Sequence, residues 1–134
     1  MLNRNIRWYT EFTLEGKKAH GSFTMCLKYF KWTEEAAKIA DKINSKKILR
    51  REYNKYLIHE HILPLKVVIE ELYDLKFITK RKVIKILDQT EMIMVTKEED
   101  KKLTDTGFQE SGTREERLAI LSPLDKRYIN NTID

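Results

Sequence analysis

Two histidines and a carboxylate stand side by side in a short apolar segment of this chain. His59, Glu60 and His61 lie within residues 56–65, where most of the other side chains are apolar. If the segment is a β-strand, successive side chains point to opposite faces, so His59 and His61 share one face and Glu60 lies on the other. Ionisable groups in an apolar environment need partners, and a metal ion or a substrate can be one. This segment is therefore where we first expect chemistry.

The surrounding sequence predicts an α+β fold, a mainly helical single domain over residues 1–134 with a small antiparallel β element. Alternating and apolar runs predict strands at 57–62 and 91–95, the first of them ended by Pro64. Between the strands, apolar residues at helical spacing predict one helix from residue 65, and a second helix is expected to start at Thr79. The sequence thus predicts two strands with a helical pair inserted between them.

Capping signals locate the helices that follow. Thr96-Lys97-Glu98-Glu99 is a capping box that predicts a helix over 97–103, which completes a β-β-α order. Residues 22–32 fit either a helix or a loop. The remaining elements are expected as a strand at 6–14, helices at 33–44 and 45–56, and a helix opened by a second capping box at Thr113-Arg114-Glu115-Glu116.

The run Glu60-His61-Ile62-Leu63-Pro64, on the first strand of this order, resembles the HNH (ββα-metal) nuclease family. In that family an acidic residue and a histidine stand together and are followed by an apolar residue, any residue and a proline. The resemblance covers residues 56–107 and implies metal-dependent hydrolysis of phosphodiester bonds. It implies that His61 is the general base, with Glu60 and Asp100 as ligands of Mg²⁺ or Mn²⁺. His59 would be a further ligand or a phosphate contact.

The sequence departs from the family at the residue that orients the base. Many members have an asparagine between the strands, whereas no asparagine lies between Asn54 and Asn130 here. Asp88 or Gln89, just before the second strand, could take that role. A second metal site is also open, in which His59 and His61 bind Zn²⁺ or Ni²⁺ with His20 or Asp100, because imidazole ligands suit these ions.

Charge is distributed unevenly along the chain. The net charge is +5, but residues 1–90 hold 19 basic against 11 acidic residues, and residues 91–134 hold 7 against 10. Basic clusters suit phosphate backbones, since binding there releases counterions. We therefore expect a nucleic-acid partner, with DNA favoured over RNA, and the predicted contacts are Lys46, Lys47, Arg50, Arg51, Lys80, Arg81 and Lys82.

Composition excludes several other classes of protein. No apolar run reaches the roughly 18 residues that a membrane-spanning helix needs, so no membrane partner is expected. The single cysteine, Cys26, excludes an internal disulfide framework and is expected to be a small buried hydrophobe. No glycine-rich phosphate loop is present. These features, with an N-terminus that lacks the pattern of a signal peptide, favour the reducing cytoplasm.

The missing asparagine favours a second hypothesis from a different class. The chain would be a non-catalytic nucleic-acid-binding or protein-inhibitor module of a mobile genetic element. It would use its basic half for nucleic acid, or its acidic C-terminal part for a basic protein partner. The two hypotheses differ in whether the histidines and carboxylates form one metal site.

Overall fold

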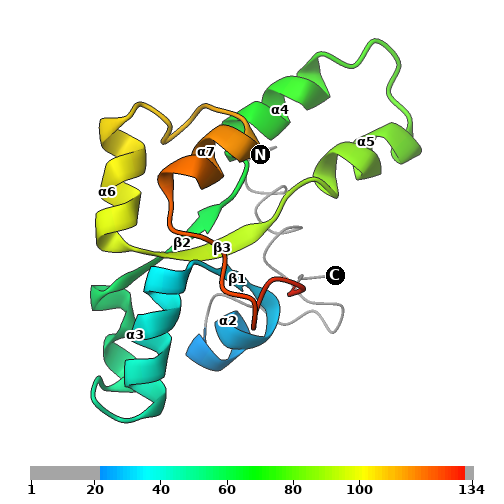
Figure 1. Ribbon diagram of the computed structural model, residues 1–134. Helices are drawn as coiled ribbons and strands as arrows, with labels where there is room; N and C mark the ends of the chain where they lie inside the picture. Colours follow the sequence, from blue (N-terminus) through cyan, green and yellow to red (C-terminus); the bar gives the residue numbers. More distant parts are fainter. Residues whose placement is uncertain (1–21, 132–134) are drawn as a thin grey trace.

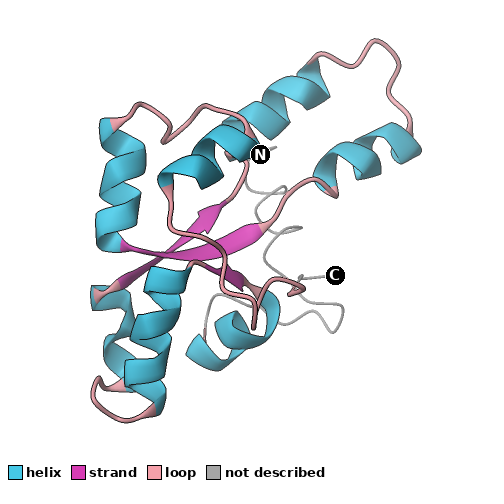
Figure 2. Ribbon diagram, viewed as in Figure 1, coloured by secondary structure: helices cyan, strands magenta, loops and turns pink. Residues whose placement is uncertain are grey.

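A small mixed sheet with helices on both faces forms the centre of the protein (Figures 1 and 2). The computed structural model describes residues 22–131. The sheet has three strands in the order β1 (Lys31–Trp32), β3 (Met92–Thr96), β2 (Leu57–His61). β3 pairs antiparallel with β2 and parallel with β1. The predicted α+β class and the antiparallel pair are confirmed, and β1 adds a parallel strand that the sequence did not reveal.

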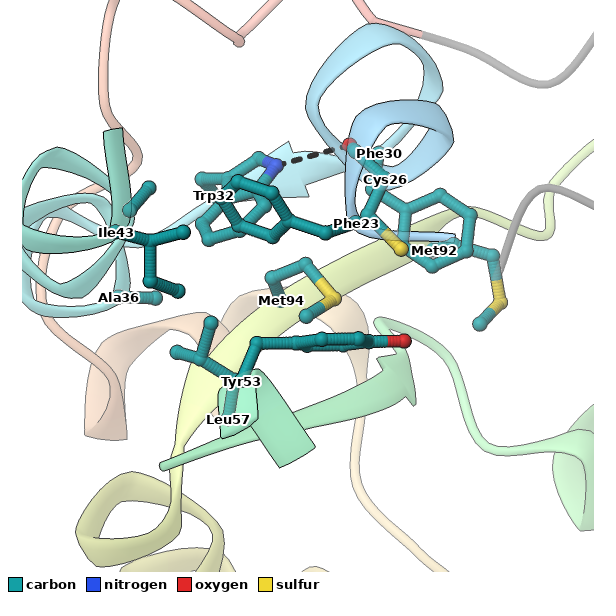
Figure 3. Packing of buried hydrophobic residues seen from close by; sticks show 11 residues of the cluster. Phe23, Cys26, Phe30, Trp32, Ala36, Ile43, Tyr53, Leu57, Met92 and Met94 are labelled. Carbon is teal, nitrogen blue, oxygen red and sulfur yellow. Dashed lines mark hydrogen bonds between the residues drawn. The ribbon is translucent and has the colours of Figure 1, made fainter. Parts of the chain in front are cut away.

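One face of the sheet is covered by α2 (Phe23–Tyr29), α3 (Glu34–Asn44) and the 3₁₀ helix η2 (Arg50–Lys55). Met94 of β3 lies in the middle of this core, as Figure 3 shows. The indole Nε1 of Trp32 donates to the carbonyl oxygen of Cys26 at 3.0 Å (Figure 3). Cys26 is fully buried, and burial raises the pKa of its thiol to about 12. The prediction that Cys26 is a buried hydrophobe is confirmed.

The other face of the sheet is covered by α6 (Lys97–Asp105) and α7 (Arg114–Ile120). Ile93 and Val95 of β3 point to this side and pack with Leu103 and Leu121. A strand buried on both faces reads as a continuous apolar run, which is why Met92–Thr96 lacks a polar position until its last residue.

The predicted helical pair lies between β2 and β3 along the chain. It consists of α4 (Leu65–Tyr73) and α5 (Lys80–Leu87), and α5 packs on α4. Thr79 starts α5 as predicted, because its hydroxyl accepts a hydrogen bond from the backbone N–H of Lys82. We call residues 65–87 the α4–α5 arm. Figure 1 shows that the arm extends away from the sheet.

The structure corrects one expected helix and decides the conformation of one ambiguous segment. The helix expected at 45–56 is wrong, because the chain turns after α3 through Lys46, whose φ of 63° lies in the left-handed region, and only η2 follows. Residues 22–32, left open between helix and loop, form α2 and then β1. The strand expected at 6–14 and His20 lie outside the described residues.

A buried carboxylate joins three segments beside α6. Glu99 completes the predicted capping box with Thr96 and is 4% exposed. Its Oε1 accepts hydrogen bonds from the Thr33 hydroxyl at 2.6 Å and the Thr96 N–H at 3.1 Å. Its Oε2 accepts from the backbone N–H and the hydroxyl of Ser122, both at 2.9 Å. Glu99 therefore stabilises the fold, and these bonds satisfy its oxygens.

We expect Glu99→Ala to lower the free energy of unfolding by about 2–4 kcal/mol, because it leaves several buried donors without an acceptor. Urea unfolding followed by circular dichroism measures the change. Glu98→Ala, an exposed position on the same helix, is the matched control and should change stability by less than about 0.5 kcal/mol. Equal effects of the two substitutions would contradict this role.

Candidate functional site

Strand β2 presents the three predicted ionisable residues on two different faces. All five of its residues pair one to one with β3, so no bulge changes the alternation. Leu57 belongs to the core cluster with α2, α3 and η2, and His59 packs on Phe30 and Tyr53 of the same cluster. On the opposite side, Glu60 approaches Arg117 of α7. Glu60 and His61 therefore do not meet on one face of the strand.

Both histidines lie on the face of β2 that packs against α2, α3 and η2. The His59 ring lies edge-on to Phe30 and to Tyr53, with centroids 5.9 Å and 6.1 Å away. His61 is 8% exposed, and its backbone carbonyl accepts a hydrogen bond from Nη2 of Arg117 at 3.2 Å. Aromatic neighbours of this kind pack well against an imidazole ring.

The Glu60 carboxylate, by contrast, lies near a buried arginine, and the negative charge of Asp100 acts on the same guanidinium. Arg117 is 2% exposed, and its Nη2 lies 4.0 Å from Oε2 of Glu60. Burial lowers the pKa of the Arg117 guanidinium, and the negative charges of Glu60 and Asp100 oppose that shift. The Arg117 guanidinium thus supplies, from within the protein, a positive charge that interacts with the negative charges of Glu60 and Asp100.

Hydrogen bonds from Arg117 also tie two loops to the sheet. Nε donates to the carbonyl of Ile62 at 2.8 Å, and Nη1 donates to the carbonyl of Phe108. Nη1 also lies within hydrogen-bond distance of the carbonyls of Gln109 and Ser111, at 3.3 Å and 3.4 Å. A planar guanidinium with five donors can serve several carbonyls at once, which a lysine cannot do.

Sequence reasoning missed Arg117, although a local signal exists. Arg117 and Leu121 are four residues apart and both are buried, so the helical period places a cation on the core-facing side of α7. A second cluster of ion pairs, which is only partly buried, was also missed. Glu91 pairs with Lys31 at 2.8 Å and with Arg114 at 2.8 Å. Burial raises the pKa of the Glu91 carboxyl, but the two cations outweigh that effect and hold it below its usual range.

The predicted metal ligands do not fit a single site in this arrangement. Within residues 22–131, no group of three or more His, Cys, Asp or Glu side chains lies close enough together to hold a metal ion. Glu60 lies 4.0 Å from Arg117 and the charge of Asp100 acts on the same guanidinium, whereas His59 and His61 lie on the other face of β2. Metal binding by His59, Glu60, His61 and Asp100 stays a prediction from the sequence.

The predicted nucleic-acid contacts fall into two groups rather than one surface. The first group follows α3 and occupies η2, and the second lies in the first turn of α5. Figure 1 places η2 and α5 at opposite ends of the molecule. Arg50 is partly engaged, since its Nη1 donates to the Thr24 hydroxyl at 3.2 Å and its guanidinium lies over the Phe23 ring. The members of the two groups are Lys46, Lys47, Arg50 and Arg51, and Lys80, Arg81 and Lys82.

The α4–α5 arm combines cations with exposed apolar side chains. Every residue of α5 is at least partly exposed. Several of the large apolar side chains that the protein exposes also lie in the arm, namely Tyr73, Phe77, Ile78 and Ile84. A cluster of exposed apolar groups among charged residues is typical of an interaction surface, whereas single exposed apolar residues are ordinary.

No protein-family model, curated protein or solved structure matches this chain. Within the described residues, no helix is both long and apolar enough to cross a membrane.

We expect Arg117→Ala to lower the free energy of unfolding by about 3–5 kcal/mol, because it leaves Glu60 near the core without its cation and several carbonyls without a donor. Arg117→Lys should recover only a part of this loss, since an ammonium cannot reproduce the guanidinium fork. Thermal and urea unfolding measure both changes. Lys126→Ala removes an exposed cation and serves as the control. A loss below about 1 kcal/mol for Arg117→Ala would contradict a central structural role.

Proposed function

We propose that this chain binds nucleic acid through the α4–α5 arm and does not hydrolyse it. One observation supports this proposal above the others. Lys80, Arg81, Lys82 and Lys85 are four cations within one eight-residue helix, and that helix contains no acidic residue. Within residues 22–131, none of the four forms an ion pair with a carboxylate.

The position of these cations is unfavourable for the isolated helix. Lys80, Arg81 and Lys82 occupy the first turn of α5, where the helix dipole favours negative charge. Arg81 and Lys85 are four residues apart, and like charges at that spacing repel each other by a few tenths of a kcal/mol. A bound phosphate backbone would relieve both effects, because it supplies negative charge beside the helix.

The basic group after α3 is a weaker candidate for the same contact. It includes Glu52, which pairs with Lys55 at 3.4 Å, and Arg50 already contacts Thr24 and Phe23. Its charges are therefore partly compensated within the protein, whereas the α5 cations have no carboxylate partner among the described residues.

Binding without hydrolysis is supported by the two faces of β2. A nuclease of the type that the sequence resembles would need the base and the metal-binding acid at one phosphate. Here Glu60 lies beside Arg117, and His61 follows His59 on the other face of the strand.

Neutralising the exposed side of α5 should weaken nucleic-acid binding. For Arg81→Gln/Lys82→Gln/Lys85→Gln we expect a large loss of affinity at low salt. We also expect the slope of log Kd against log salt to fall by about 0.9 for each phosphate of duplex DNA that the variant no longer neutralises, or about 0.7 on a single strand. Fluorescence anisotropy with labelled oligonucleotides at several salt concentrations measures both quantities.

The matched control changes the same number of charges in the other basic group, as Lys46→Gln/Lys47→Gln/Arg51→Gln. The side chains changed in both triple variants are exposed, so neither variant should unfold the protein. Binding that is unchanged in the α5 variant, or equally weakened in the control, would overturn the assignment of the contact to the arm.

Hydrolysis itself is tested by incubating plasmid DNA and structured RNA with the protein in EDTA, Mg²⁺, Mn²⁺ or Ni²⁺. We expect bound but uncut nucleic acid under every condition. Metal-dependent cutting that disappears in His61→Gln, a variant that keeps a polar side chain at this buried position, would instead establish the nuclease predicted from the sequence. Melting temperatures of both proteins show whether the substitution disturbs the fold.

A further inference from the structure

The tip of the α4–α5 arm exposes two aromatic rings beside its cations. Tyr73 ends α4, and Phe77 lies in the connection to α5; each is 75% exposed. Ile78, next to Phe77, is 79% exposed. The connection is the part of the arm farthest from the sheet in Figure 1. Burying a phenylalanine side chain stabilises a folded protein, and this chain does not gain that free energy at the tip.

Charge surrounds these rings. Lys76 directly precedes Phe77, and Lys80 follows three residues later. Nζ of Lys82 lies 5.7 Å from the centroid of the Phe77 ring. A ligand that contacts the rings must therefore place negative charge within reach of several ammonium groups, which indicates an anionic ligand with flat apolar parts.

We infer that the arm recognises single-stranded nucleic acid, whose bases stack on Phe77 and Tyr73 while the backbone lies along the cations of α5. This inference rests on the proposed function and names the class of nucleic acid that it favours. An unpaired strand offers both parts of the ligand, because its phosphates are charged and its base faces are open. In a duplex the bases already stack on one another, so the cations can bind the backbone but the rings find no base face.

The alternatives fit these observations less well. An amphipathic helix that binds a membrane surface presents its apolar residues along one side, whereas in α5 the residues Val83, Ile86 and Leu87 are already partly buried in the arm. The most exposed apolar side chains of the arm, Tyr73, Phe77 and Ile78, lie instead at its tip. Charge on α5 also disfavours a second copy of the same tip, since equal cations would repel each other.

The test compares affinities for an oligothymidylate, an oligoadenylate RNA and a duplex, each of about 20 nucleotides, which exceeds the roughly 4–16 nucleotides of typical single-strand sites. We expect both single strands to bind more tightly than the duplex. Phe77→Ala should weaken single-strand binding roughly 5-fold or more and leave the salt slope unchanged, since it removes stacking and no charge. Tyr56→Ala, an exposed ring outside the arm, is the control and should leave affinity unchanged.

Two further variants separate stacking from general apolar contact. Phe77→Trp should keep single-strand affinity, because the larger ring still stacks on a base, and Phe77→Leu should lose it. Quenching of the new tryptophan fluorescence on addition of the oligonucleotide would report the stacked base directly. Equal affinity for single strand and duplex, or full affinity of Phe77→Ala, would overturn the inference.

The two proposals fail in distinguishable ways. If Phe77→Ala leaves the affinity for oligonucleotides unchanged but the α5 charge variant loses salt-dependent binding, the arm binds nucleic acid and only the single-strand preference is wrong. If neither variant changes oligonucleotide binding, the proposed function fails as well. Phe77→Ala that retains oligonucleotide affinity but loses binding to phosphatidylserine vesicles, or converts a dimer to a monomer in light scattering, would overturn the inference in favour of a membrane or a second copy.

Discussion

The strand β3 is buried from Met92 to Thr96, and its side chains take part in the hydrophobic clusters on both faces of the sheet. Met94 faces the core formed with α2, α3 and η2, and Ile93 and Val95 face the core under α6 and α7. β3 also provides the hydrogen bonds for both β1 and β2. Because a one-residue shift in its register would exchange the two sets of side chains, the packing on each face keeps the register of the whole sheet.

This register decides what the residues around Glu60 can do. With regular pairing, the carboxylate on one face of β2 and the imidazoles on the other are separated by the sheet itself. On the face of β2 that holds Glu60, Arg117 interacts with the Glu60 carboxylate through its charge and donates hydrogen bonds to carbonyls of the loop before α7. Removing a buried, hydrogen-bonded guanidinium is costly, so this cluster stabilises the contacts between the end of β2, the loop before α7 and α7 itself.

The α4–α5 arm differs from the rest of the protein in physical character. The sheet and its helices bury their apolar side chains and pair charges such as Glu91 with Lys31. The arm leaves aromatic rings exposed, and within residues 22–131 the cations of α5 have no carboxylate partners. Stability therefore comes from the body of the protein, and substitutions on the arm should cost the fold little, as the recognition proposed for the arm requires.

The features that could be predicted from the sequence are those that depend on neighbours along the chain. Threonine caps, capping boxes, the apolar period of α4 and the alternation of β2 were all predicted correctly because each involves residues within a few positions of one another. The run of cations on α5 was likewise visible. Three features became visible only in the folded structure: the parallel pairing of β1 with β3, the approach of Arg117 to Glu60, and the exposure of Phe77. Those outcomes depend on contacts between residues far apart in the sequence, or on which side chains the packed core leaves outside, and local periodicity contains no information about either.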